Sequence, residues 1–221
     1  PRKFFEIWIP REKFVSAVIN EDSLSITRVD DPYFGFGFGP NPVIDPRWSS
    51  FTISRDTPKE VTKSFKLVGQ WDAYGIATKP FDITYQVITD LDFINNLIEK
   101  NAPELSIRAE DPEVLAWVGI EEKAVGAICK WESGRYVLSA IVVAENFRGQ
   151  GFGKKITQAL ITEAHKRGSD YVALGVMANN AAAIATRCCS PPESEMISRS
   201  RRVTKPRRSS ISSTRFRITS A

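Results

Sequence analysis

Between residues 83 and 186, short apolar runs alternate with segments of helical spacing. The runs are rich in β-branched residues and predict strands over residues 83–88, 114–120, 124–131, 135–143 and 169–177. The run at 135–143 is apolar at most positions, which is typical of a strand buried on both faces. Only Glu-Glu-Lys separates the second run from the third, so these two should form a hairpin.

Two of the intervening segments carry apolar residues at the spacing of a helix. One face is formed by Leu91, Ile94, Leu97 and Ile98 in the first segment, and by Ile156, Ala159, Leu160 and Ala164 in the second. Thr89 or Asp90 can cap the first helix, and Gly168 follows the second. With a third helix over residues 181–186, the predicted order β-α-β-β-β-α-β-α describes a mixed α/β domain.

Residues 1–82 have a different character. They hold eight of the 13 prolines and 14 of the 23 aromatic residues, and short strand-like pieces are separated by Pro, Asp and Gly. This pattern predicts a β-rich N-terminal module. Its glycine-rich stretch at residues 33–43 is interpreted as an aromatic loop, since the following prolines rule out a helix start that could hold phosphate. The short junction to residue 83 predicts that the module packs on the following domain.

Helical and strand periodicity disappears at residue 187. Nine Ser and nine Lys/Arg fill about half of residues 187–221, a composition that predicts a disordered tail. This tail carries a net charge of +7, whereas residues 1–186 carry −3. Two hypotheses fit the abrupt change: a native basic tail that contacts an acidic partner weakly, or a shifted reading frame. The body itself has no charge pattern typical of nucleic-acid binding.

Composition excludes several further classes of protein. The longest apolar runs are far shorter than the roughly 18 residues of a membrane-spanning helix, so no membrane association is expected. Three cysteines and one histidine give neither a disulfide framework nor a metal site. A reducing, cytoplasmic location is the simplest interpretation of this cysteine content.

The most informative motif lies between the fourth predicted strand and the second helix. Arg148, Gly149, Gly151 and Gly153 form a glycine-rich turn at the expected helix start. Free backbone N–H groups at such a position bind anions, and glycines let a phosphate group approach the backbone. The spacing matches neither the dinucleotide fingerprint G-x-G-x-x-G nor the Walker A motif.

Together with the preceding strand and the following helix, the pattern R-x-x-G-x-G resembles the acyl-CoA-binding motif of the GNAT acyltransferase superfamily. The resemblance covers residues 83–186 and includes the Asn-led segment "ANNAAAIAT". It implies a mixed sheet flanked by helices. It also implies an N-acyltransferase that moves acetyl from acetyl-CoA, without a metal, to a primary amine on a small molecule or a protein. The amine attacks the thioester directly in this family.

The resemblance also assigns positions to the ligand. Backbone groups of Ile141, Val142 and Val143 are expected to pair with the pantetheine arm. N–H groups of the loop are expected to hold the pyrophosphate, from Arg148, Gly149, Gln150, Gly151, Phe152 and Gly153. Arg148 and Lys154 add positive charge, and Asn179 or Asn180 is expected to contact the arm beside the thioester.

Two familiar catalytic groups of the family are missing at their expected positions. Gly175 stands where many members carry a Glu that acts as base, and Arg187 stands where they carry a Tyr that acts as acid. Glu145 and Tyr136 flank the fourth strand and are weak candidates for these roles. The alternative function is therefore a catalytically impaired CoA-binding or interaction protein derived from such an enzyme.

Overall fold

The computed structural model describes residues 14–105, 107–131, 134–180 and 194–205. Its strands are β1 (Phe14–Ile19), β2 (Leu24–Arg28), β3 (Phe34–Phe38), β4 (Ser50–Ser54), β5 (Lys66–Ala77), β6 (Gln86–Ile88), β7 (Val114–Ile120), β8 (Ala124–Lys130), β9 (Tyr136–Val143), β10 (Tyr171–Met177) and β11 (Ser194–Thr204). Its helices are α2 (Leu91–Asn101) and α3 (Phe152–Lys166), with short 3-10 turns η2 (Lys59–Thr62) and η3 (Glu145–Phe147).

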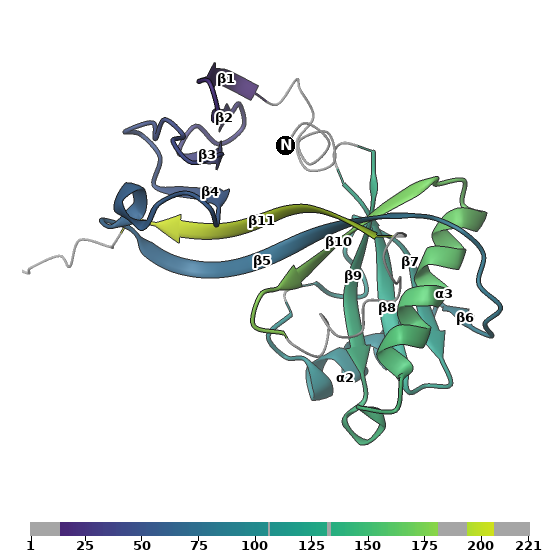
Figure 1. Ribbon diagram of the computed structural model, residues 1–221. Coiled ribbons are helices and arrows are strands. Elements are labelled where there is room, and N and C mark those ends of the chain that lie inside the picture. The colour runs from purple at the N-terminus through teal and green to yellow at the C-terminus, as the bar shows by residue number, and fades with distance from the viewer. Residues whose placement is uncertain (1–13, 106, 132–133, 181–193, 206–221) are drawn as a thin grey trace, which may run out of the picture.

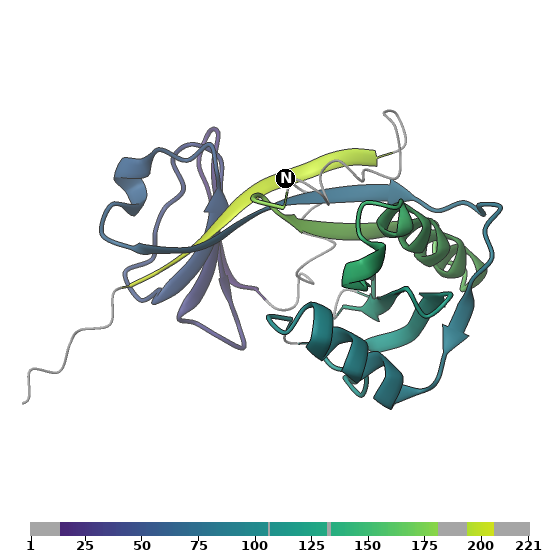
Figure 2. The ribbon, with the colours of Figure 1, turned by 90° about the horizontal axis from the view of Figure 1, so that it is seen from below.

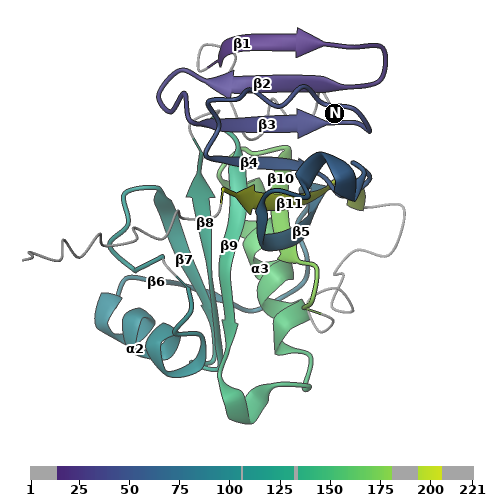
Figure 3. The ribbon, with the colours of Figure 1, turned by 90° about the vertical axis from the view of Figure 1, so that its left-hand side faces the viewer.

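All these strands join one mixed, eleven-stranded sheet in the order β1-β2-β3-β4-β11-β5-β10-β9-β8-β7-β6. The two long strands β5 and β11 connect the β1–β4 end of the sheet to the end that carries the helices (Figure 1). Strands β1 to β4 lie side by side beyond these long strands and form one end of the sheet (Figure 3). Helices α2 and α3 lie on opposite faces of strands β7 to β9 (Figure 2).

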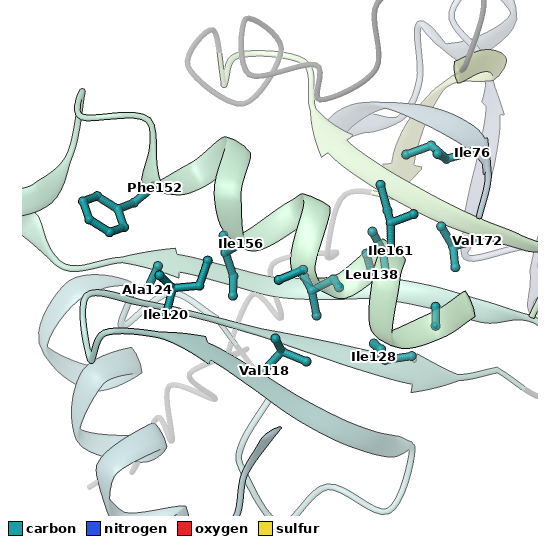
Figure 4. Close-up of a cluster of buried hydrophobic side chains, with 13 residues drawn as sticks. Ile76, Val118, Ile120, Ala124, Ile128, Leu138, Phe152, Ile156, Ile161 and Val172 are labelled. Atoms are coloured by element: carbon teal, nitrogen blue, oxygen red, sulfur yellow. The ribbon is translucent and has the colours of Figure 1, made fainter. Parts of the chain in front are cut away.

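The two predicted helices form because their apolar faces are buried against this sheet. Ile156, Leu160 and Ile161 of α3 are fully buried and pack on Leu138 and Val172 of the sheet (Figure 4). On the other face, α2 buries three of its four predicted apolar positions; Leu91 remains 41% exposed. The start of α2 and the end of α3 follow the prediction. The side chain of Asp90 accepts the N–H of Phe93 at the start of α2, and Gly168 has φ 80° after the end of α3.

Strand β5, from the N-terminal region, pairs with β10 on the side opposite β9. Seven residue pairs join β10 to β5 in antiparallel register, from Tyr171–Ala77 to Met177–Trp71. Ile76 of β5 is buried in the core beneath α3. The β-rich character of the N-terminal region is thus confirmed, and its last strand continues the sheet of the following domain. The division into residues 1–82, 83–186 and 187–221 stays a prediction.

The expectation of a disordered tail is wrong for its central part. Strand β11 lies between β4 and β5 and pairs with both. Ser200, Arg201 and Val203 are buried there, and Arg201 donates to the carbonyl oxygen of Thr57 at 2.5 Å. Sheet pairing satisfies the strand's backbone groups and compensates for its low apolar content. The remainder of the tail, including Arg187, lies outside the described residues.

The glycine-rich stretch at residues 33–43 contains a strand rather than the predicted loop. In β3, Phe34, Phe36 and Phe38 alternate with glycines. A Cβ atom on Gly35 would lie 1.9 Å from the buried indole ring of Trp48, so only glycine fits at this position. The alternation therefore reflects close packing of the backbone against a tryptophan, a requirement that the local sequence does not reveal.

Candidate functional site

Strands β9 and β10 start as neighbours and then separate. Three parallel pairs join them, the last between Leu138 and Leu174. Beyond this pair, the described residues show no pairing between the two strands, and they diverge in Figure 1. Residues 139–143 of β9 therefore present a free strand edge about 13 Å long to the space beside β10. Such an edge can accept an extended, amide-containing chain as an added strand.

A β-bulge lies within this free edge. The register of β8 and β9 shifts between the pairs Val125–Val142 and Ala127–Ser139. Ala140 lies in this interval with φ 46°, a conformation that non-glycine residues rarely adopt. The bulge interrupts the regular ladder and re-aims backbone groups at the point where the two strands separate.

The two faces of the sheet differ at the point of separation. On the α3 side, Leu138 and Leu174 belong to the packed core beneath the helix. On the opposite side, β10 presents Ala173 and the exposed Gly175, and Ala73 of β5 lies directly across from Gly175. On the face opposite α3, Gly175 is therefore exposed, whereas its neighbours Ala173 and Ala73 are buried.

The glycine loop stands at the wide end of the gap, between β9 and α3. Gly149 and Gly151 adopt φ values of 76° and 82°, and a Cβ atom on either would meet nothing within 4 Å. In the described part of the chain, no acceptor is recorded for the five successive N–H groups of residues 149–153. The first turn of α3 also carries no acidic residue. Free donors, open space and the positive end of the helix dipole are the features that favour binding of an anion.

Two lysines lie beside the loop, and Lys123 is already paired with the carboxylate of Glu121 at 2.5 Å. The ammonium groups of Lys123 and Lys155 lie 5.3 Å and 4.9 Å from the ring centre of Phe152, and Lys123 also contacts the ring of Phe147. The two rings pack edge to face with centres 5.8 Å apart. Lys123 comes from the β7–β8 turn, and its position beside this motif could not be predicted from the sequence.

Arg148 uses its guanidinium group within the protein. Its Nη2 donates to the carbonyl oxygen of Asn101 at 2.7 Å, and its Nε donates to that of Val143 at 3.3 Å. The side chain of Asn101, the last residue of α2, accepts the N–H of Glu145 at 2.9 Å. The sequence alone indicated no role for Asn101, because Glu145 and Arg148 lie more than 40 positions away along the chain.

The other predicted ligand contacts lie around the same gap. Ile141, Val142 and Val143 belong to the free segment of β9. Asn179 and Asn180 follow β10 after Ala178 and are exposed. Gln150 donates to the carbonyl oxygen of Asn146 at 2.9 Å, and Lys154 lies exposed in the first turn of α3. The predicted helix over residues 181–186 lies outside the described residues.

The two weak catalytic candidates are far apart. Tyr136 begins β9 and pairs with Val172, in the part where β9 and β10 are still neighbours. Glu145 follows the other end of β9 and is exposed beside the glycine loop. The length of β9 separates them, so they cannot act together at one reacting group. Their roles stay predictions.

The described residues include one cysteine. Cys129 is buried beneath α2, and burial raises the pKa of its thiol to about 11. Among the described residues, no group of three or more His, Cys, Asp or Glu side chains could hold a metal ion. None of the helices in the described ranges has the length and apolar character needed to cross a membrane.

Comparison with known proteins agrees with this geometry. The profile of the Acetyltransferase (GNAT) family matches residues 71–186. No curated protein matches the chain. Among solved structures, the chain is similar to a GCN5-related N-acetyltransferase from Kribbella flavida, with 12% identity and a TM-score of 0.52 over 86% of this chain and 89% of that one. A GNAT-family acetyltransferase from Colwellia psychrerythraea shows 15% identity and a TM-score of 0.52 over 85% and 82% of the two chains.

Proposed function

Because the chain belongs to the GNAT acetyltransferase family, we propose that it is an acyl-CoA-dependent N-acyltransferase that moves acetyl from acetyl-CoA to a primary amine. The acceptor amine is carried by a small molecule or by a protein, and the reaction takes place in the cytoplasm. One observation carries the proposal: five free N–H groups at residues 149–153 lead directly to the free edge of β9. A ligand with a pyrophosphate at one end and an amide-containing arm fits this combination.

The protein's own groups bind and orient the reactants in this proposal. The loop and the start of α3 hold the pyrophosphate, while Lys123, Lys154 and Lys155 add charge. The edge of β9 at Ile141 to Val143 holds the arm, and Asn179 or Asn180 contacts it from β10. Backbone N–H groups at the bulge polarise the acyl carbonyl.

The transfer itself is a direct displacement. The amine nitrogen attacks the acyl carbonyl carbon, the carbon–sulfur bond breaks, and the thiolate leaves with the electron pair. The amine reacts on the face opposite α3, where Gly175 is exposed and carries no side chain. Water accepts the proton of the amine and another proton neutralises the thiolate, because Gly175 offers no side chain as a base.

The absence of a side chain at Gly175 also favours a second candidate function. A protein that binds CoA and transfers its acyl group very slowly would serve as a CoA-binding or interaction protein. The two functions share one binding site and differ only in their rate of transfer to an amine.

Free-thiol release from acetyl-CoA, measured with a panel of small amines, peptide N-termini and lysine peptides, separates the two functions. An acceptor that accelerates thiol release well above the rate of hydrolysis supports the transferase. CoA binding with equal, slow release for every acceptor supports the binding protein. Absence of CoA binding by calorimetry contradicts both.

A further inference from the structure

We infer that Asn101 and Arg148 are positioning residues that hold the glycine loop in its anion-binding shape. Their hydrogen bonds to the loop and to its neighbours are called the strut below, and Arg148 belongs to this strut rather than acting as a phosphate ligand. This inference rests on the proposed function for the identity of the ligand. The contacts of the two side chains, however, exist in the protein alone.

The contacts connect the end of α2 to both ends of the turn that precedes the glycine loop. Asn101 accepts the N–H of Glu145, which opens η3, while its own Nδ2 donates to the carbonyl oxygen of Leu97 at 2.9 Å. Arg148 closes the same turn and bridges two carbonyl oxygens, on Asn101 and on Val143. The loop is therefore fixed by α2 on one side and by β9 on the other, immediately before its first free N–H group at Gly149.

The position of the guanidinium also has an electrostatic effect. The end of α2 at Asn101 exposes carbonyl oxygens and carries the negative end of the helix dipole. Because η3 links Asn101 to the loop, this negative end lies close to the place where a pyrophosphate would bind. The Arg148 guanidinium donates to one of these carbonyls and compensates the local negative charge. It thereby supports anion binding without contacting the anion.

A strut and a phosphate ligand respond differently to a change from Arg to Lys. A phosphate ligand that acts through charge keeps most of its effect in Arg148→Lys. A strut loses it, because an ammonium group cannot reproduce the fork that bridges two carbonyls. We therefore expect Arg148→Lys and Arg148→Ala to weaken CoA binding by similar factors, about tenfold each, in calorimetric titrations.

Asn101→Ala tests the other half of the strut at a residue outside the groups that we propose to bind CoA. We expect CoA affinity to fall about fivefold, and the double variant with Arg148→Ala to lose little more than Arg148→Ala alone, since both release the same turn. Asn95→Ala is the matched control. Asn95 lies on the same helix and makes two comparable side-chain bonds, to Ala109 and Glu110, away from the loop. It should leave CoA affinity unchanged.

Hydrogen exchange of the unliganded protein tests the strut independently of CoA. The amides of residues 144–148 should exchange faster in Asn101→Ala than in Asn95→Ala, whereas Asn101→Asp retains an acceptor for the Glu145 N–H and should exchange more slowly than Asn101→Ala. Unchanged exchange in Asn101→Ala, or an Arg148→Lys variant with wild-type CoA affinity, overturns the inference. If the wild type does not bind CoA, the proposed function fails and the exchange experiment still decides the strut.

Discussion

Replacing Gly151 by Asp is the most direct test of the glycine loop. Gly151 precedes the first residue of α3, and its N–H is one of the five free donors. A Cβ atom at this position meets nothing within 4 Å, so the new side chain enters open space without displacing any neighbour. That space is where the proposed pyrophosphate would lie. The substitution therefore places a carboxylate against the anion and adds bulk between the anion and its donors.

The expected effect on CoA binding is large. A hydrogen bond to a charged group contributes about 1.5–3 kcal/mol, and several should be lost together. Two like unit charges 4 Å apart add a repulsion of about 4 kcal/mol at an effective dielectric constant of about 20. Since each ~1.4 kcal/mol corresponds to a factor of ten, CoA affinity should fall by at least about two orders of magnitude.

Two control variants separate this effect from backbone strain. Gly151→Asn has nearly the same shape as Gly151→Asp but no charge, so the difference between them measures the repulsion. Gly168→Asp introduces the same residue at a matched φ of 80°, also with nothing within 4 Å, at the other end of α3. That position is about 25 Å away along the helix, beyond the reach of screened electrostatics. It should leave binding unchanged.

The assay is calorimetric titration of CoA and dephospho-CoA into the wild type and the three variants, with circular dichroism as the control for folding. All variants should stay folded, because the loop is a surface connection. If folded Gly151→Asp binds CoA as tightly as the wild type, the loop is not the pyrophosphate site and the proposed function loses its main support.

Three further predictions concern stability. Asp72→Ala removes the buried partner of Arg55 and should lower the free energy of unfolding by about 3 kcal/mol, whereas Asp45→Ala, in a more exposed pair with Arg47, should have little effect in urea titrations. Burial raises the Cys129 pKa to about 11, so the folded state holds a proton that the unfolded state loses at lower pH. The free energy of unfolding should therefore fall as pH rises from about 9 to 11, and it should fall less in Cys129→Ala. Because β5 supplies Ile76 to the core beneath α3, calorimetry should show one unfolding transition; two independent midpoints would contradict the packing of the N-terminal region.

Local features of this protein could be predicted from its sequence. The helical faces of α2 and α3, the hairpin of β7 and β8, and the cap at Asp90 each depend on residues a few positions apart. The glycine loop belongs to the same class, since Gly149 and Gly151 mark left-handed backbone next to a predicted helix start. The sequence therefore predicted the shape of the glycine loop, where we propose that an anion binds, and the family to which the chain belongs.

Features that depend on distant pairing required the tertiary structure. Strand β5 lies beside β10 although about 100 residues separate them, and β11 inserts between β4 and β5 despite its polar composition. The role of Asn101 likewise exists only because α2 ends beside the loop. Apolar periodicity indicates whether a segment is buried, but it does not predict which neighbouring strand pairs with the segment. Since backbone hydrogen bonds are the same for every residue type, strand partners and the separation of β9 from β10 were decided by the fold alone.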